Sequence, residues 1–332
     1  MVTIREDWLR LTKEDIIDPD LLICDPHHHL WYDSSIEYTV DDFSKDIGGG
    51  HRVTKTVFVE SRLMLKKDAT LEMQPVGETE FVHNVVTQRK NRNEEIDVAA
   101  GIVGFADLTL GDAVEKVLKA HISAGKGRFR GIRHICAWDQ SPVFKSRWNT
   151  PKGLLADKNF REGFAHLQKY NLSFDAWLFH PQLTELVDLV REFADTSIII
   201  NHIGGPLGIG PYASKRKEVI NDWKRGIEQL SGYPNVSLKL GGLGMEICGF
   251  DWHKRNVPPN SSELAETMAP YYLWCIEQFG AERCMFESNF PVDKQSYSYT
   301  ILWNAFKKIV KDLSHHDKCA LLHDTASKVY RL

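Results

Sequence analysis

The sequence predicts a (β/α)8 barrel, or TIM barrel, and three observations support this fold class. Eight short runs rich in apolar and β-branched residues are spaced along the chain, and segments with helical periodicity separate most of them. Several runs, such as residues 197–200, are apolar without alternation, which is typical of parallel strands covered on both faces. Polar residues gather directly after the runs, where such barrels carry their functional side chains. We therefore expect a single α/β domain.

The expected strands occupy residues 21–24, 54–59, 98–105, 129–135, 172–179, 197–200, 236–240 and 283–286. Helical periodicity between them is clearest over residues 112–121 and 182–193. The rival architecture, an open doubly wound sheet, usually carries a Gly-rich turn after its first strand. Here a histidine-rich segment follows that strand instead, which favours the barrel.

The chain of 332 residues divides into two parts of unequal size. Residues 1–20 are polar with a few apolar anchors, and we expect them to form an N-terminal extension that packs outside the core. Residues 21–332 are expected to form the barrel, since α/β barrels of this length are commonly one domain.

The composition excludes several kinds of partner. A net charge of −4 and a pI near 6.4 argue against nucleic acid and anionic membranes. The sequence has no apolar run of about 18–20 residues and no signal-peptide core at its start. The six cysteines are scattered, which is typical of reduced thiols. We expect a cytoplasmic enzyme with a small-molecule substrate, and a homodimer is compatible with a barrel of this size.

The most informative segment is Asp25-Pro26-His27-His28-His29-Leu30-Trp31, directly after the first expected strand. Alternate side chains of an extended chain share a face, so His27 and His29 point the same way and His28 points the opposite way. Two imidazoles one residue apart can bind a metal ion or a substrate oxygen. A polar turn is the alternative interpretation of three consecutive histidines.

Other strand ends supply further candidates, namely Arg133 in the fourth, His180 after the fifth, His202 after the sixth, Lys239 in the seventh and Glu287 after the eighth. An interior arginine needs an anion, and a substrate carboxylate would be bound bidentately. A salt bridge to Glu60 or Glu78 is the alternative partner of Arg133, and both glutamates are also candidates for orienting imidazoles.

Aromatic and polar neighbours complete the expected site. Trp31 and Trp138 follow strand ends and are expected to form an apolar wall over a ring-shaped substrate. We expect Lys239 to belong to the polar network that binds the substrate. His134 alternates away from Arg133 and is expected to pack behind the barrel wall.

Five motifs carry a family resemblance: Asp25-Pro26-His27-His28-His29-Leu30-Trp31, Gly77-Glu78-Thr79-Glu80, Gly131-Ile132-Arg133-His134, Asn201-His202-Ile203-Gly204-Gly205-Pro206 and Phe286-Glu287-Ser288-Asn289-Phe290-Pro291. Together they resemble the amidohydrolase superfamily, specifically the amidohydrolase-2 group of metal-dependent hydrolases and sugar-acid lactonases. The resemblance runs from about Leu22 to the C-terminus. It implies that His27 and His29 are the first-strand pair, that His202 is a further imidazole of the site, and that Arg133 contacts the substrate.

The chain departs from the family pattern at the eighth strand. The family's Ser-Asp-Trp-Pro type motif ends that strand with an aspartate that binds metal or activates water, whereas Asn289 occupies this catalytic position here. An amide has no basic lone pair, so Asn289 cannot be the general base. Glu287 lies two residues earlier and faces the same way. Our hypothesis is that Glu287 replaces the aspartate as base or ligand, with Asp293 at the mouth as the second candidate.

The resemblance and the strand-end residues together predict a hydrolase that opens the ester bond of a lactone of a sugar acid or a small carboxylated ring. His27, His29 and His202 would polarise the carbonyl, while Glu287 or Asp293 takes a proton from water. One divalent metal, zinc or manganese, is the expected cofactor, with His27, His29, His202 and His180 as candidate ligands. Metal-independent catalysis by imidazole and arginine donors stays open.

Two other functions remain open from the sequence. A metal-dependent decarboxylase of a hydroxybenzoate-like acid would use similar histidines and would release carbon dioxide without opening lactones. A non-catalytic barrel that binds a small acid is the second alternative, and Asn289 is the feature in its favour. Amide or imide hydrolysis also stays open, since the electrophile differs little in shape.

Overall fold

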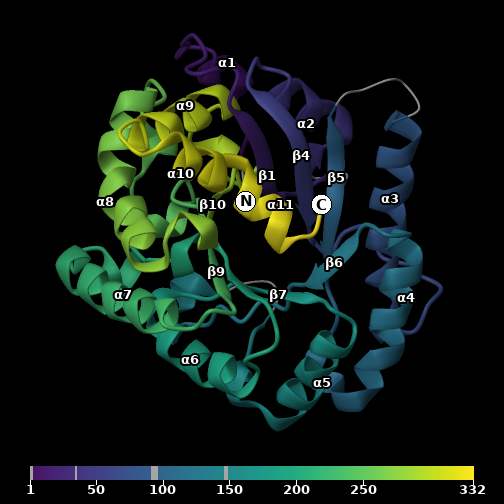
Figure 1. Cartoon of the computed structure of the whole chain (residues 1–332). Helices are drawn as coiled ribbons and strands as arrows, with labels where there is room; N and C mark the ends of the chain where they lie inside the picture. Colours follow the sequence, from purple (N-terminus) through teal and green to yellow (C-terminus); the bar gives the residue numbers. More distant parts are fainter. Residues whose placement is uncertain (1–2, 34–35, 91–95, 146–148) are drawn as a thin grey trace.

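Eight strands form one parallel sheet in the computed structural model, which describes residues 3–33, 36–90, 96–145 and 149–332 (Figure 1). The strands are β1 (Leu22–His28), β4 (Arg52–Val59), β5 (Asp97–Gly104), β6 (Phe129–Ile132), β7 (Ser173–Ala176), β8 (Ile198–Ile200), β9 (Val236–Leu240) and β10 (Cys284–Phe286). Their order in the sheet is their order in the chain, and a parallel bridge between His28 and Phe290 joins the first strand to the segment after the last. The predicted barrel is confirmed.

The strand boundaries differ from the prediction by three or more residues at three places, one of which is β6, which ends at Ile132, three residues before its predicted end. β1 continues through the histidine motif to His28, with an irregular register between Asp25 and His28. β7 ends at Ala176, three residues before the predicted end. The chain there leaves the sheet and enters a 3-10 turn, η5 (His180–Gln182), whose proline has no backbone N–H to pair with a neighbouring strand.

Most helices surround the barrel on its outside, whereas the last helix of the chain lies across one end of the barrel (Figure 1). The helices are α1 (Glu6–Leu9), α2 (Val40–Ile47), α3 (Val76–Lys90), α4 (Glu115–Gly125), α5 (Lys158–Lys169), α6 (Leu183–Glu192), α7 (Arg216–Ser231), α8 (Ser261–Phe279), α9 (Tyr299–Ile309), α10 (His315–Cys319) and α11 (Thr325–Val329). A short hairpin, β2 (Trp31–Asp33) with β3 (Ile36–Tyr38), follows β1. Side chains cap several helices, as Asn260 does at α8, because they satisfy N–H groups that the helix leaves unpaired.

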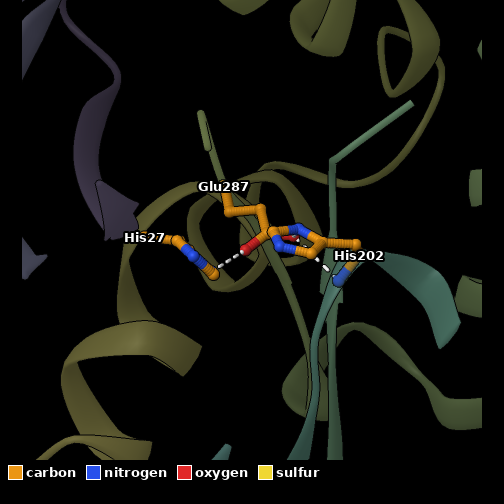
Figure 2. A group of neighbouring side chains, drawn as sticks. All are labelled: His27, His202 and Glu287. Atoms are coloured by element: carbon orange, nitrogen blue, oxygen red, sulfur yellow. Dashed lines mark hydrogen bonds and ion pairs between the residues drawn. The ribbon is translucent and has the colours of Figure 1, made fainter. Parts of the chain in front are cut away.

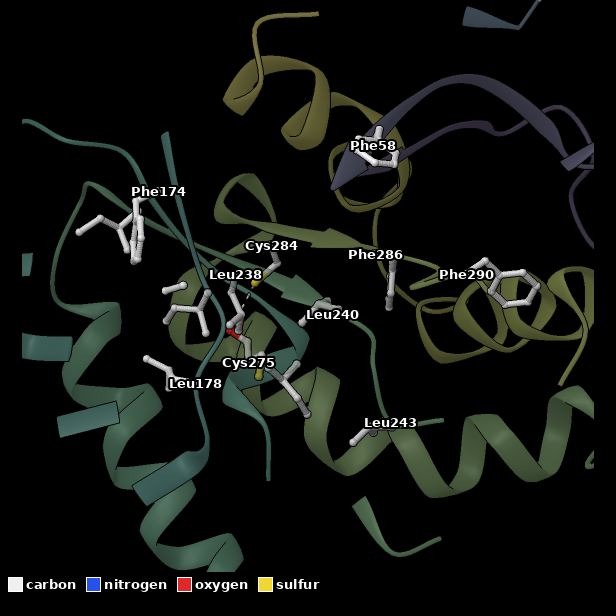
Figure 3. Close-up of a cluster of buried hydrophobic side chains, with 14 of the residues drawn as sticks. Phe58, Phe174, Leu178, Leu238, Leu240, Leu243, Cys275, Cys284, Phe286 and Phe290 are labelled. Atoms are coloured by element: carbon white, nitrogen blue, oxygen red, sulfur yellow. Dashed lines mark hydrogen bonds between the residues drawn. The ribbon is translucent and has the colours of Figure 1, made fainter. Parts of the chain in front are cut away.

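Alternate strand residues supply two apolar clusters. The larger cluster lies between the strands and the helices and includes Phe174, Leu238, Leu240 and Phe286 (Figure 3). The smaller one is formed by the opposite faces of the strands, inside the barrel, together with Ala326 and Tyr330 from the end of the chain. The C-terminus therefore closes the bottom of the barrel. Among the helices described, none has the length and apolar character needed to cross a membrane.

Two histidines, His121 on α4 and His134 just after β6, predict acid sensitivity. Burial lowers the pKa of His121 and of His134 to about 4, from 6.5 in a free side chain. Between these pH values the unfolded chain binds more protons than the folded one, so stability falls as the pH drops from 6.5 to 4. Each histidine contributes a slope of about 1.4 kcal/mol per pH unit. Urea unfolding at several pH values measures this slope.

The variant His121→Gln tests whether His121 contributes to this pH dependence of stability. In His121→Gln the amide can still donate to the carbonyl of Phe105, which the imidazole Nε2 contacts at 2.9 Å, but it has no titrating group in this range. The variant should therefore show a shallower loss of stability in acid. An unchanged slope would mean that other groups cause the acid sensitivity.

Candidate active site

A cavity of about 200 Å³ lies at the carboxyl ends of the strands. Its lining combines polar and apolar side chains from different strand ends: His29, Trp31, Glu60, Ser61, Arg133, Ile135, Trp177, His202, Met245, Asn289 and Val292. Several predicted site residues thus meet in one place. The cavity is small, so it suits a compact ring rather than an extended chain.

His27, His202 and Glu287 form a compact set that we call the histidine–glutamate group (Figure 2). Glu287 Oε1 lies 2.6 Å from Nδ1 of His202 and also accepts the His202 backbone N–H at 3.0 Å. Its other oxygen, Oε2, lies 2.7 Å from Nδ1 of His27. One buried carboxylate therefore orients two imidazoles, as outer carboxylates do in many histidine sites.

Backbone conformation contributes to this geometry. His202 has a φ of 53° and Asn289 a φ of 55°, both in the left-handed region that non-glycine residues rarely adopt. The bond from the His202 N–H to Glu287 holds the first of these turns, and Asn289 donates its own N–H to the carbonyl of His27 at 2.9 Å. Such conformations concentrate at functional sites, where surrounding contacts maintain them.

His29 completes a set of three imidazoles. Its Nδ1 lies 2.8 Å from the carbonyl oxygen of Val59, which can only accept, so Nδ1 carries the proton and Nε2 the lone pair. Its ring packs edge-on against His27, with centroids 5.0 Å apart, and lies parallel to Trp31. His28 points the opposite way, as predicted, and stacks on Phe43.

The three imidazoles are held neutral by their surroundings. Burial lowers the pKa of His27, His29 and His202 well below the usual range, and the guanidinium of Arg133 adds to this effect at all three. Burial raises the pKa of Glu287, while the nearby ammonium of Lys239 opposes that shift. A neutral imidazole has a nitrogen lone pair that can bind a metal ion or accept a proton from water.

Arg133 reaches the cavity from β6 and is paired with Glu60. Its Nε donates to Glu60 Oε1 and its Nη2 to the Glu60 carbonyl, both at 2.7 Å, and Nη1 lies 3.3 Å from Nε2 of His27. The salt-bridge alternative of the sequence analysis is thus present. A guanidinium has five N–H groups, so two remain beyond these three contacts for a ligand in the cavity that Arg133 lines.

Glu78 binds the backbone of a loop, whereas the sequence analysis considered it as a partner of Arg133 or of an imidazole. Its oxygens accept the backbone N–H groups of Ser61, Arg62 and Leu63, and they therefore hold the loop that leaves β4. Its hydrogen-bond partners in the described part of the chain are thus these backbone groups and the Ser61 hydroxyl, and not an imidazole of the site. Glu60, by contrast, lines the cavity and is neutralised by Arg133.

The structure does not bring His180 and Trp138 to the cavity. His180 lies in η5, where its Nδ1 accepts the N–H of Leu207 at 3.3 Å and its ring packs against Tyr212. Trp138 borders a separate cavity of about 330 Å³ formed by the loop after β6. Both residues follow their strands by more than two positions, so strand alternation no longer determines where they point.

Asp293 and Lys239 lie near the site but beneath its surface. Asp293 is fully buried rather than at the mouth, and it accepts bonds from Tyr297 Oη, from the Gly244 N–H and from Asn289 Nδ2. Lys239 points into the barrel interior below the histidine–glutamate group and is also fully buried. Neither residue lines the cavity, so direct contact with a substrate is not what their positions favour.

Trp177 is one of the cavity residues that the sequence analysis missed, together with Ser61, Ile135, Met245 and Val292. The Trp177 ring packs edge-on against His202, with centroids 4.6 Å apart. Asp175 of β7 points into the barrel, where it binds Lys239, so Trp177 two residues later points the same way. Strand alternation, followed from Asp175, was the signal that could have selected Trp177 instead of His180.

The residues present fit a divalent metal. Ligand atoms of the histidine–glutamate group lie within 4.8 Å of one another, and each imidazole has its Nδ1 next to an acceptor oxygen, from Glu287 or Val59. This anchoring of one ring nitrogen is the usual arrangement of metal-binding histidines, which bind through the other. Neutral imidazoles suit zinc or manganese. The two imidazoles of the histidine–glutamate group, His27 and His202, would be ligands, with Glu287 behind them and His29 as the further imidazole at the cavity.

Asn289→Asp is predicted to destabilise the metal-free protein. The Asn289 amide donates to Asp293 Oδ1 at 2.9 Å, and burial already raises the pKa of Asp293 to about 7. A second carboxylate would lose that bond and repel Asp293, so we expect a loss of about 1–3 kcal/mol. Zinc should reduce the loss by compensating the added charge. Thermal unfolding with and without zinc measures both effects.

Asn289→Ala is the control for that prediction, because it removes the same hydrogen bond without adding a charge. The aspartate variant should be less stable than the alanine variant without zinc and should gain more from zinc. Equal stabilities of the two variants under both conditions would contradict the electrostatic argument.

Comparison with known proteins gives consistent matches over most of the chain. A family model described as amidohydrolase matches residues 24–332. The uncharacterised protein y4mH of Sinorhizobium fredii is 32% identical over 94% of this chain and 99% of its own length. L-fucono-1,5-lactonase of Burkholderia multivorans is 24% identical over 70% of this chain and 72% of its own. A crystal structure of a Burkholderia multivorans amidohydrolase with bound zinc superposes with a TM-score of 0.72 at 22% identity, covering 94% of this chain and 99% of the other.

Proposed function

Since this chain belongs to the amidohydrolase family, we propose that it is a hydrolase that opens the ester bond of a lactone, of either a sugar acid or a small carboxylated ring. The observation that carries the proposal is the histidine–glutamate group beside Arg133 at one small cavity. Relatives named as lactonases support the substrate class, at 24% and 23% identity.

The cavity walls suit a ring with one polar edge. Trp31, Trp177 and Met245 line the cavity with apolar surface, which would cover the ring face and exclude water. The two remaining N–H groups of Arg133 would donate to a carboxylate or to the lactone carbonyl. Such donors are most effective when they bind the oxyanion that develops as the carbonyl is attacked.

Water would be activated at His202 in the protein without metal. Its Nε2 would take a proton from water as the water oxygen bonds to the lactone carbonyl carbon. Glu287, 2.6 Å from Nδ1, would stabilise the imidazolium, as the carboxylate of a catalytic triad does. The ring C–O bond would then break, and the imidazolium would return its proton to the leaving alkoxide. In this scheme the base is His202, and Glu287 orients it.

A divalent metal bound by His27, His29 and His202 would supply Lewis-acid polarisation of the carbonyl oxygen. Such an ion would take the His27 Nε2 lone pair that Arg133 Nη1 faces at 3.3 Å, whereas the two contacts of Arg133 to Glu60 do not involve the imidazole lone pairs.

Proton release from a panel of sugar-acid and dicarboxylic lactones tests the proposal. The panel is run with chelator-treated protein and with the same protein after zinc or manganese is restored. His202→Asn should lose ring opening, whereas His180→Asn, a buried histidine outside the cavity, should retain it.

Ring opening by the chelator-treated protein would support catalysis by protein groups, and ring opening only after metal is restored would support the three imidazoles as ligands. Release of carbon dioxide from hydroxybenzoates without lactone opening would replace the proposal by a decarboxylase. Ligand-induced stabilisation without any turnover would replace it by a binding protein.

A further inference from the structure

A buried polar set lies inside the barrel beneath the histidine–glutamate group. It consists of Asp175 from β7, Lys239 from β9 and Tyr330, which follows α11, and we call these three residues the floor cluster. All three have no exposed surface. None of them lines the cavity, so the proposed reaction gives them no direct role.

Lys239 ties the floor cluster to the segment that carries His27. Its Nζ donates to Asp175 Oδ2 at 2.7 Å and to the carbonyl oxygen of Pro26 at 2.9 Å, and it lies 3.3 Å from His27 Nδ1. The contacts to Asp175 and Pro26 use two of the three N–H groups of the ammonium. Lys239 therefore bridges three strands and holds the backbone directly before His27.

Asp175 is in turn held from two sides. Tyr330 Oη lies 2.8 and 3.0 Å from its two oxygens, and Asn201 Nδ2 donates to Oδ2 at 3.0 Å. Tyr330 reaches this place because the end of the chain enters the barrel, as the position of the C-terminus in Figure 1 shows. The position of Lys239 thus depends on the last helix of the chain.

Stability alone gives a poor reason for this arrangement. Burial of an ion pair costs so much desolvation that apolar residues of similar volume are often equally stable or more so. The smaller apolar cluster, with Val57, Val103 and Met285, surrounds the same interior. The feature that apolar residues could not reproduce is the set of contacts from Lys239 to Pro26 and His27.

His27 lies between two cationic side chains. Lys239 Nζ is 3.3 Å from Nδ1, and Arg133 Nη1 is 3.3 Å from Nε2. A neutral imidazole has one N–H, and Glu287 Oε2 at 2.7 Å from Nδ1 is the acceptor in reach. The favoured tautomer of His27 therefore carries its proton on Nδ1 and its lone pair on Nε2.

We infer that Lys239, held by Asp175 and Tyr330, is a positioning residue: its bond to the Pro26 carbonyl keeps the His27 ring seated against Glu287, where the proton lies on Nδ1 and the Nε2 lone pair faces Arg133. This inference rests on the proposed function for its kinetic consequence only. The position and tautomer of His27 are properties of the protein without substrate. They can be measured even if the proposed reaction is wrong.

The double variant Lys239→Met/Asp175→Asn tests the inference, because it removes both buried charges together. Histidine-selective ¹⁵N–¹H spectra of the metal-free protein report the tautomer, and the His27 signals are those lost in His27→Gln. We expect the two ¹⁵N shifts of His27 to move toward each other as the tautomers mix. For the lactone opened by the wild type, kcat should fall about 10- to 100-fold with little change in KM.

Lys307→Met is the matched control. Lys307 is also a buried lysine that donates to backbone carbonyls, those of Ile17 and Asp18, but it lies outside the cavity and the floor cluster. This variant should lose stability without changing the His27 signals or kcat. If the double variant does not fold, Tyr330→Phe removes one anchor of Asp175 and should shift the same signals less.

An unchanged His27 tautomer in the folded double variant, or in Tyr330→Phe if only that variant folds, would overturn the inference. A fall in kcat with unchanged His27 signals would also overturn it, since general loosening would then explain the loss. A shifted tautomer in a protein whose wild type opens no lactone would support the positioning role and reject only the proposed reaction.

Discussion

Replacement of Glu287 by glutamine is expected to lower kcat/KM for lactone opening by about 100- to 10,000-fold while the barrel stays folded. The carboxylate lies within 2.7 Å of Nδ1 of both His27 and His202 and can accept a hydrogen bond from each. Glutamine has one acceptor oxygen and one NH₂ group, so it would accept from one ring and donate to the other. One imidazole would then turn its N–H toward the cavity and lose its lone pair there. Steady-state kinetics and circular dichroism measure the two parts of the prediction.

Glu14→Gln is the control for that variant. Glu14 is a half-buried glutamate that binds Ser261 and Asn304 far from the cavity, so its replacement should leave kcat/KM unchanged. Full activity of Glu287→Gln would show that the histidine–glutamate group does not carry the reaction. If Glu287→Gln loses both activity and structure, the comparison is made with Glu287→Asp, which keeps the charge. This variant should recover part of the activity and part of the folded structure.

Replacement of Arg133 by methionine is expected to affect both stability and activity. Glu60 would lose its main partner while it remains buried, which costs about 3–5 kcal/mol. Loss of the guanidinium from the cavity would lower kcat/KM by about 100- to 1,000-fold, the usual effect of removing one donor to an oxyanion. Urea unfolding and kinetics on the same protein measure the two effects separately.

Two further variants separate the causes. In Arg133→Met/Glu60→Gln the buried carboxylate is neutral, so stability should recover while activity does not. Arg62 also faces Glu60, at 3.5 Å, but does not line the cavity, so Arg62→Met should reduce activity much less than Arg133→Met. Recovery of activity in the double variant would contradict a direct role of Arg133 in binding.

The barrel was predictable because its signals are local. Each strand is an apolar run of a few residues, and each helix shows its own periodicity, so no long-range information was needed to count them. The opposite directions of His27 and His28 were predictable for the same reason, since alternation is a property of a single strand. The strand-end rule then placed His29, Arg133 and His202 at one cavity, as the structure shows.

The same rule failed where a residue lies beyond the regular strand. His180 and Trp138 follow strand ends in sequence, but a turn and a loop carry them to other surroundings. Asp293 was expected at the mouth and is instead buried below it, where Tyr297 and Asn289 bind it. Loop paths depend on packing between distant segments, and a single sequence carries little information about them.

Local sequence patterns were enough to predict the barrel, the strand that carries each polar residue, and the replacement of the expected aspartate by Asn289. They also pointed to Glu287 as the carboxylate that faces the histidines. The folded barrel was needed to see that Glu287 lies under two imidazoles and orients them, and that Lys239 and Tyr330 support His27 from the barrel floor. The reason is physical: residues separated by more than 80 positions act as one unit only because strands that are distant in the chain converge at the barrel axis.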